Sequence, residues 1–314
     1  MERIKNTNLY NRFLTSPMYN IVMGLKHPIL LGRYLKYRGS ADKPKVVGLE
    51  TTLKQITVQK MSVTRFGDGE LKWLLNENSY AFQEGSEALS ERLKEVITAT
   101  DAPKLAICIP DVFNGLSQYM PQNKNAWIEL IARYNHAWRP YLQAQSVFYD
   151  ANMSRFYIDR RDKSQTAYYF ELLKQIWQDR EVVIVEGQAT RFGVGNDLLS
   201  NAKSVKRILG PAQNAFDQYD AIMDIIKEQV ASDALILIAL GPTATVMAYD
   251  LAKLGYQAID IGHADLEYEW YQMKATQRVA LNDRYVNEVE GGSQVAESEA
   301  PDYHAEIIAT IRED

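Results

Sequence analysis

The stretch ALILIALGPTATVMAYDLAKLGYQAIDIG (residues 234–262) decides the fold class of this sequence. An apolar run at 234–241 has the length of a buried strand, and residues 243–255 have the apolar spacing of a helix that stops at Gly255. Residues 256–262 are a second apolar run. A strand, a helix and a strand in this order are typical of two parallel strands joined by a helical crossover.

The same alternation continues on the N-terminal side of this stretch. Further strands are predicted at 61–67, at 104–110, within 146–159 and at 181–187, and helices at 70–76, 86–100, 123–140 and 164–178. Ser86 is the expected N-cap of one helix and Pro140 the expected end of another. Continuous apolar strands between helices predict an α/β protein whose mostly parallel sheet carries helices on both faces.

The composition limits the class of protein. Of 314 residues, 46% are hydrophobic, which is enough for a packed core. The single cysteine, Cys108, excludes an intramolecular disulfide and fits a reducing compartment. We see neither a signal peptide nor an apolar run of roughly 18 residues that would span a bilayer, so we expect a cytoplasmic protein.

The charge is distributed unevenly. Residues 1–45 contain nine Lys or Arg and two Asp or Glu, a local charge of +7, and the remainder carries −12. An acidic body argues against nucleic acid as a partner. We expect a basic amphipathic N-terminal extension (1–45), a main domain (46–290) and an acidic linker with a short helix (291–314). The extension is either a helix packed on the body or a peripheral contact with the inner face of a membrane.

Polar residues follow four of the predicted strands. These segments are GDGE (67–70), EGQATRFGVGND (186–197), GPTAT (241–245) and GHADLEYEW (262–270). Ligands of open parallel sheets bind at the carboxyl ends of the strands. We therefore expect the four strand ends to converge on one site.

Asp68 and Glu70 lie in the glycine-rich stretch RFGDGE (65–70). In an extended chain, residues two apart point to one face. Two carboxylates on one face suit Mg²⁺ or Mn²⁺, which prefer oxygen ligands. The simpler interpretation is a solvated turn, since Asp-Gly is a common turn signal.

The GPTAT segment predicts a sharp exit from a strand into a helix. Gly241 and Pro242 would form the turn, and Thr243 or Thr245 would cap the helix, whose N-terminus suits a phosphate. The segment is not a Walker motif, and ordinary helix capping explains it equally well.

The segment TRFGVGND combines a cation with two glycines. Arg191 would bind a diphosphate through its planar fork, while Gly193 and Gly195 would let the backbone approach the ligand. Asn196 and Asp197 stand where a helix would begin. The structural alternative is an Arg–Asp pair with an asparagine cap.

Five ionisable residues lie within DIGHADLEYE (260–269), namely Asp260, His263, Asp265, Glu267 and Glu269. A histidine or carboxylate at a strand end can serve as a general base toward an attacking hydroxyl. The same groups could ligate a metal or hydrogen-bond within a loop.

Taken together, these blocks resemble a family. RFGDGE, SRFYID (154–159), VEGQATRFGVGNDLL (185–199), the segment from 239 to 270 and Asn-Glu at 287–288 are similar, in the same order, to the GT-D-type glycosyltransferases, long catalogued as a bacterial domain of unknown function. The resemblance extends from about residue 50 to about residue 290.

The resemblance implies a Rossmann-like GT-D fold that uses a UDP-sugar donor, usually UDP-glucose, with Mn²⁺ or Mg²⁺ assisted by Asp68 and Glu70. Its matching positions imply donor-binding residues Arg65, Gly67, Arg191, Gly193, Gly195, Asn196, Asp197, Gly241, Pro242 and Thr243. They also imply catalytic candidates His263, Asp265, Glu267 and Glu269.

The expected function is transfer of a hexose to a glycan, glycoprotein or lipid-linked glycan acceptor in bacterial surface glycan assembly. Two other classes fit the same residues: a metal-dependent nucleotide-sugar hydrolase or phosphoesterase, and a non-catalytic module that binds sugar nucleotides.

Overall fold

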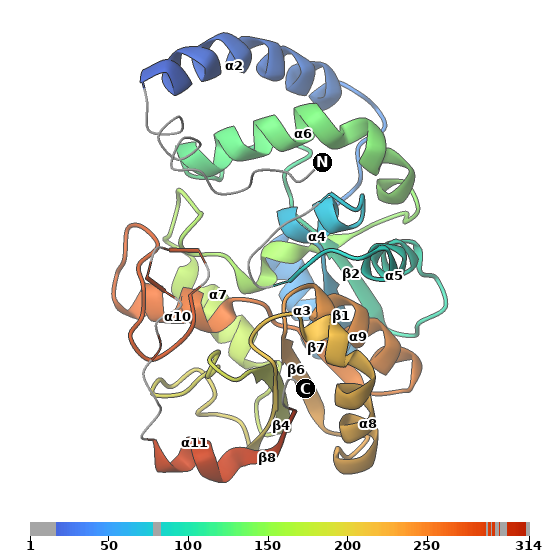
Figure 1. Cartoon of the computed structure of the whole chain (residues 1–314), viewed down its shortest axis with the longest axis vertical. Coiled ribbons are helices and arrows are strands. Elements are labelled where there is room, and N and C mark those ends of the chain that lie inside the picture. Colours follow the sequence, from blue (N-terminus) through green and yellow to red (C-terminus); the bar gives the residue numbers. More distant parts are fainter. Residues whose placement is uncertain are drawn as a thin grey trace, which may run out of the picture.

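The computed structural model describes residues 17–77, 83–286, 288–289, 291–292, 295 and 300–311, with side chains described from residue 28 onward. Within these residues, eight strands form one sheet in the order β3-β2-β1-β7-β6-β4-β5-β8, and every adjacent pair is parallel (Figure 1). The strands are β1 (Ser62–Arg65), β2 (Leu105–Ile109), β3 (Tyr149–Asp150), β4 (Glu181–Gly187), β5 (Ser204–Gly210), β6 (Leu235–Ala239), β7 (Gln257–Asp260) and β8 (Ile307–Thr310). The α/β prediction is confirmed.

The helices alternate with these strands along the chain. They are α2 (Pro17–Arg38), α3 (Leu49–Gln59), α4 (Asp68–Trp73), α5 (Glu87–Thr98), α6 (Pro121–Leu142), α7 (Thr166–Lys174), α8 (Tyr219–Gln229), α9 (Pro242–Lys253), α10 (Ala264–Gln272) and α11 (Pro301–Glu306). Ser86 caps α5 as predicted, since its Oγ accepts a hydrogen bond from the Leu89 amide at 3.1 Å. Helix α6 continues two residues past Pro140, because a proline in the last turn costs little of the remaining hydrogen-bond ladder.

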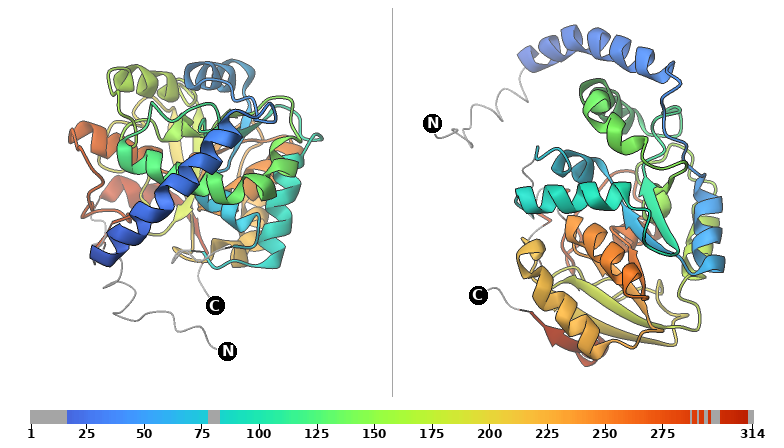
Figure 2. Two further views of the ribbon diagram at one scale, coloured as in Figure 1. Left: turned by 90° about the horizontal axis from the view of Figure 1, so that it is seen from above. Right: turned by 90° about the vertical axis from the view of Figure 1, so that its right-hand side faces the viewer.

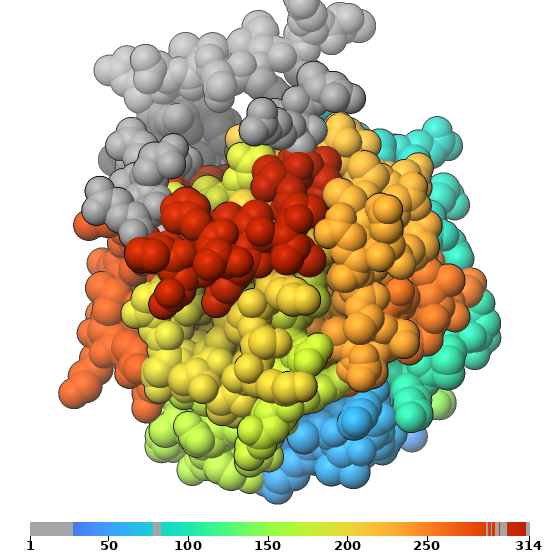
Figure 3. Space-filling model, turned by 90° about the horizontal axis from the view of Figure 1, so that it is seen from below, coloured from blue at the N-terminus to red at the C-terminus, as the bar shows by residue number. Residues whose placement is uncertain are grey.

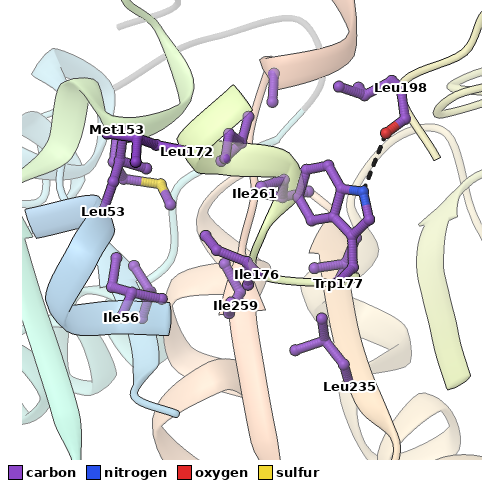
Figure 4. Close-up of a cluster of buried hydrophobic side chains, with 14 of the residues drawn as sticks. Leu53, Ile56, Met153, Leu172, Ile176, Trp177, Leu198, Leu235, Ile259 and Ile261 are labelled. Atoms are coloured by element: carbon purple, nitrogen blue, oxygen red, sulfur yellow. Dashed lines mark hydrogen bonds between the residues drawn. The ribbon is translucent and has the colours of Figure 1, made fainter. Parts of the chain in front are cut away.

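The sheet separates two hydrophobic layers. Alternating residues of β4 point to opposite faces, so Val182 packs with α3 and α7 while Val183 packs with α8 and α9. Figure 4 shows the first layer, in which Trp177 fills the space beside Leu235 and donates its indole N–H to the Leu198 carbonyl at 3.0 Å. The prediction that helices cover both faces is therefore confirmed.

Three strands differ from the sequence expectation. Strand β3 has only two residues, because the Asp150 carboxylate accepts the Asn152 amide at 2.9 Å and turns the chain into a short 3₁₀ helix. Strands β5 and β8 were not predicted. Strand β8 follows α11 and pairs with β5, so the sheet extends beyond residue 290. Figure 3 shows the C-terminal segment, in red, lying against the yellow part of the chain.

Helix α2 lies against α6, on the far side of the molecule from α11 (Figures 1 and 2). Leu30 and Tyr34 are buried in the hydrophobic cluster shared with α6, whereas Ile29 and Leu35 are 62% and 52% exposed. At least this part of the N-terminal extension packs on the body. None of the described helices combines the length and apolar character that crossing a bilayer requires.

A buried ion pair joins the C-terminal segment to the sheet. The Arg207 guanidinium on β5 donates to Glu186 of β4 and to Glu306 of α11, both at 2.6 Å. Arg207 is 2% exposed and Glu186 is fully buried. Such a cation holds together groups that would otherwise repel or remain unpaired.

We predict that Arg207→Met lowers the free energy of unfolding by about 3–5 kcal/mol, because Glu186 loses its cation inside the protein. The control is Lys203→Met, because Lys203, directly before β5, forms an exposed pair with Glu181 of β4. The control should change the free energy by less than about 0.5 kcal/mol. Urea unfolding measures both, and equal losses would contradict the prediction.

Candidate active site

A cavity of about 810 Å³ lies at the carboxyl end of the sheet. Four strand ends contribute to its lining: Arg65 of β1, Asp260 of β7, Ala239 of β6 and Gly187 of β4. These strands are consecutive in the sheet, in the order β1-β7-β6-β4. The prediction that these four strand ends converge is thus confirmed.

The glycine-rich turn after β1 forms one wall. Gly67 is the N-cap of α4, and Asp68 and Glu70 lie in the first helical turn. The expectation that Asp68 and Glu70 lie in an extended segment is wrong. Because residues two apart on a helix do not share a face, the two carboxylates do not point in the same direction. Both carboxylates nevertheless line the cavity. Glu70 Oε2 accepts the Gly67 amide at 2.8 Å, and Asp68 pairs with Lys72 at 3.4 Å.

Arg65 and Asp260 form an ion pair beneath this turn. Both Nε and Nη2 of Arg65 lie 3.3 Å from Asp260 Oδ1, and Nε also donates to the Asp260 carbonyl at 3.2 Å. Burial raises the pKa of Glu70 to about 7, with the nearby Asp260 raising it further and Arg65 opposing. The turn thus places two carboxylates, Asp68 and Glu70, at the cavity wall beside the Arg65–Asp260 pair.

Helix α9 begins at the same cavity. Gly241 is its N-cap and lines the cavity, and Pro242 occupies the first turn. The prediction of a threonine cap is wrong, since no side chain caps this helix. Thr243 is fully buried, and the Thr245 hydroxyl donates to the Arg65 carbonyl and to Asp260 Oδ2 at 2.9 and 3.0 Å. Pro242 has no N–H and the Ala244 amide donates to the Gly241 carbonyl at 3.0 Å, so Gly241 is the position of this helix start that contacts the cavity.

His263 lies within a cluster of charged groups at the start of α10. Its Nδ1 lies 3.2 Å from Nη1 of Arg155 and 3.4 Å from Glu288. Burial lowers the pKa of His263 to about 4, and although Glu288 opposes this shift, the neighbouring Arg155, Arg65 and Arg278 add to it. The imidazole is therefore neutral at pH 7. Because Nδ1 accepts a hydrogen bond from Arg155, the single ring proton of His263 is on Nε2.

Arg155 is fixed by carboxylates on two sides. Its guanidinium forms a two-pronged pair with Glu288 at 2.6 Å for each contact and a further bond to Asp159 at 2.8 Å. The two arginines Arg155 and Arg278 hold the pKa of Glu288 far below its usual range. These charges neutralise one another within the cluster.

The three acids on α10 hold neighbouring loops. Asp265 accepts the Gly193 amide and the Asn196 side chain, both at 2.9 Å, and it also pairs with Arg284. Glu269 accepts Asn196 at 2.6 Å. Asp265 lines the cavity, but its oxygens are occupied by these bonds.

Glu267 is fully buried and binds backbone. Its Oε2 accepts the amides of Tyr157 and Ile158 at 2.6 and 3.1 Å, while Oε1 has no partner among the described residues. Burial raises the pKa of Glu267 to about 7 against the opposing effect of Arg155. This geometry suits a residue that positions the 155–158 segment.

The glycines shape the loop at 191–197. The prediction that a helix begins at Asn196 is wrong, because this loop consists of turns. Gly193 and Gly195 have φ of +73° and +79°. Arg191 donates to the Asp283 carbonyl at 2.7 Å, and Asp197 pairs with Tyr268 and Lys174. Neither Arg191 nor Asp197 lines the cavity, whereas Thr190 and Phe192 do.

Sequence reasoning assigned no role to Arg155 or Glu288. Arg155 lies in the SRFYID block and Glu288 in the Asn-Glu pair, so the family blocks contained the signal, while Asn287 lies outside the described residues. Within the described part of the chain, no group of three or more His, Cys, Asp or Glu is arranged to hold a metal ion. A cation here would depend on ligands from a bound substrate.

Comparisons with known proteins agree with this architecture. The family model described as the glycosyltransferase GT-D fold matches residues 63–289. A probable glycosyl transferase, Gly, of Streptococcus gordonii is 39% identical over 271 residues, which is 86% of this chain and 39% of that protein. The glycosyltransferase GlyD of Streptococcus pneumoniae is 36% identical over 270 residues, which is 86% of this chain and 33% of that protein. The chain thus aligns with two-fifths or less of these relatives.

Solved structures share the fold. A structure described as a new glycosyltransferase (DUF1792) from Streptococcus sanguinis matches with a TM-score of 0.82 and 36% identity, covering 86% of this chain and 100% of that one. Another, described as the domain of unknown function 1792 with a distinct glycosyltransferase fold, also has a TM-score of 0.82 and 36% identity, over 91% and 100% of the two chains.

We predict that Gly262→Ala displaces Arg65 from Asp260. Gly262 has φ of +51°, and an added Cβ would lie 1.8 Å from Arg65 Nη2. The matched control is Gly255→Ala, where φ is +91° and no atom lies within 4 Å, so only the backbone strain of roughly 1–2 kcal/mol remains. Urea unfolding should show the larger loss for Gly262→Ala, and equal losses would exclude the clash.

We predict a pH-dependent difference between the wild type and Glu267→Gln. A carboxyl whose pKa is raised from 4.5 to about 7 on folding contributes its full stability below pH 4.5 and loses it as the pH rises through 7. The free energy of unfolding of the wild type relative to the variant should therefore fall by roughly 3 kcal/mol between pH 4.5 and 7.5. A difference independent of pH would show that Glu267 titrates normally.

Proposed function

Since the chain belongs to the family of glycosyltransferases with the GT-D fold, we propose that it transfers a hexose, glucose first among the candidates, from a UDP-sugar to a hydroxyl group of a glycan acceptor. The observation that carries this proposal is the cavity at the carboxyl ends of β1, β7, β6 and β4. It joins a carboxylate-rich turn, an uncapped helix start and a neutral histidine in one space large enough for a nucleotide sugar.

The donor diphosphate would lie between the turn at 65–70 and the start of α9. The start of α9 favours an anion, because the positive end of the helix dipole lies at Gly241, which lines the cavity. Arg65 lines the same wall, although most of its guanidinium is engaged by Asp260. The backbone of α9 is thus the better candidate for the phosphate contact, in preference to Arg191.

The residues of the turn fit a divalent cation. Asp68 and Glu70 offer hard oxygen ligands at the cavity wall. Burial is the main cause of the raised pKa of Glu70, and the nearby Asp260 adds a smaller contribution that a cation would offset. Magnesium sites commonly combine one or two carboxylates with substrate phosphates, which agrees with the lack of a larger ligand group in the described chain. Bound Mn²⁺ or Mg²⁺ would neutralise charge on the departing nucleoside diphosphate.

His263 is better suited to orient the acceptor than to remove its proton. A pKa of about 4 makes it a weak base, and Arg155 occupies its Nδ1. Its Nε2–H can donate a hydrogen bond to a hydroxyl group of either substrate, the glycan acceptor or the sugar donor. Asp265 and Glu269 are committed to the 193–197 loop, so we assign them a positioning role.

The acceptor class is a glycan, glycoprotein or lipid-linked glycan. A lipid-linked acceptor would agree with a peripheral contact between residues 1–45 and the inner membrane face, in a protein otherwise in the cytoplasm. The exposed Ile29 and Leu35 of α2, beside Arg33 and Lys36, support that contact. Flotation with anionic liposomes tests this contact. Equal liposome binding after deletion of residues 1–45 would show that the extension does not bind the membrane.

One assay separates transfer from the other two classes of function. The protein is incubated with UDP-glucose and Mn²⁺, with and without candidate glycans, and UDP release is measured. Transfer requires release that depends on the acceptor. Release without acceptor would instead indicate a hydrolase, and binding without release a sensor module.

We predict that Glu70→Gln lowers turnover at least about 100-fold and weakens the dependence on Mn²⁺, because the amide keeps the hydrogen bond to Gly67 but loses the charge. Glu87→Gln is the matched control, since Glu87 also lies in the first turn of a helix, α5, away from the cavity. Turnover of the control should be unchanged. Wild-type turnover in Glu70→Gln would contradict the proposal that Glu70 binds the metal ion.

A further inference from the structure

Helix α6 forms a wall of the cavity that the proposed donor site does not use. Gln122, Asn123, Ala126, Trp127 and Leu130 line the cavity from this helix. Their spacing places them on one face, because residues three and four apart are neighbours on a helix. This face carries no charge, while Lys124, Glu129 and Arg133 lie at other positions around α6.

Trp127 offers an aromatic surface to the cavity. Its side chain is half-buried, packs against the hydrophobic cluster on one side and lines the cavity on the other. A tryptophan that is partly exposed inside a concave site is an energetically valuable contact for an apolar ligand surface. The apolar C–H face of a pyranose ring is such a surface.

The two carboxamides beside Trp127 are available for hydrogen bonds. Gln122 is exposed and Asn123 half-buried, and neither side chain is engaged with another described residue. Each carboxamide can both donate and accept, as hydroxyl groups do. By contrast, Arg155, Glu288 and Asp159 at the charged wall neutralise one another.

Helix α2 supports this wall from behind. Leu30 and Tyr34 of α2 are buried in the same cluster against which Trp127 packs. Figure 2 shows α2 lying across α6 on its outer side. The N-terminal extension therefore has a structural role in fixing the position of α6.

We propose that the α6 face is the acceptor subsite, and that it binds a neutral pyranose whose ring stacks on Trp127 and whose hydroxyls bond to Gln122 and Asn123. This inference rests on the proposed function, since it names the acceptor end of the same cavity. An uncharged wall suits an uncharged sugar, because burying an unpaired carboxylate there would be costly.

The test measures acceptor and donor separately. Methyl β-D-glucopyranoside, methyl β-D-galactopyranoside and a methyl glucuronide serve as acceptors, because a methyl aglycone cannot itself stack on the indole. UDP release gives the KM for the acceptor, saturation-transfer NMR gives sugar binding without turnover, and calorimetry gives the Kd for UDP with Mn²⁺. The variants are Trp127→Ala, Trp127→Phe, Gln122→Ala and, as the control on the same helix, Lys124→Ala.

We expect Trp127→Ala to raise the acceptor KM about tenfold, equivalent to about 1.4 kcal/mol, and to reduce the NMR signal of the sugar, with the Kd for UDP unchanged. Trp127→Phe should retain most of the affinity, and Lys124→Ala all of it. Gln122→Ala should also raise the acceptor KM. Because Gln122 is exposed, this variant remains informative if Trp127→Ala proves unstable. The glucuronide should bind more weakly than either hexoside.

Two results would overturn the subsite. One is an acceptor KM that is unchanged in both Trp127→Ala and Gln122→Ala. The other is a raised Kd for UDP in Trp127→Ala, which would place the nucleobase on Trp127. A wild type that releases no UDP with any acceptor refutes the proposed function instead. In that case the NMR measurement still decides the subsite, since a wild type that binds no hexoside would contradict it.

Discussion

The ion pair between Arg65 and Asp260 joins the ends of β1 and β7 at the centre of the sheet. The two residues are 195 positions apart, so the pair forms only when β1 and β7 have come together in the sheet. A buried pair of this kind is tolerated when further hydrogen bonds satisfy its atoms, and Thr245 supplies one of them from α9. The turn at 67–70, the start of α9 and Gly262 are all positioned around it.

Helix α10 organises the rest of the cavity in a similar way. Asp265 and Glu269 hold the 193–197 loop, while Glu267 holds the backbone after Arg155. Three acids in one short helix therefore bind two segments from different parts of the chain. Their clustering in the sequence is typical of a catalytic site, but their oxygens are largely satisfied by protein groups. His263 also lines the cavity, and its role is therefore the one that remains for a substrate contact.

Local sequence signals predicted the architecture where strands are continuously apolar, as in β4 and β6, and where a cap is explicit, as at Ser86. They failed for β5, because its inward-facing Arg207 breaks the apolar pattern, and for β8, which follows a helix directly in an acidic tail. Pairing with Glu186 makes that arginine acceptable inside the protein. Such compensation depends on contacts between distant residues, so no local pattern contains it.

The location of the site followed from topology, whereas the roles of its residues did not. Parallel strands bring their carboxyl ends together whatever the side chains are, so the convergence of four ends was predictable. Which groups remain available there depends on individual distances: Arg191 turns to Asp283, and Arg155 is neutralised by Glu288. The result is a cavity with one charged wall at the strand ends and one uncharged wall on α6. That asymmetry matches a reaction between a charged nucleotide sugar and a neutral hydroxyl, since each substrate would then meet the wall whose groups can satisfy it.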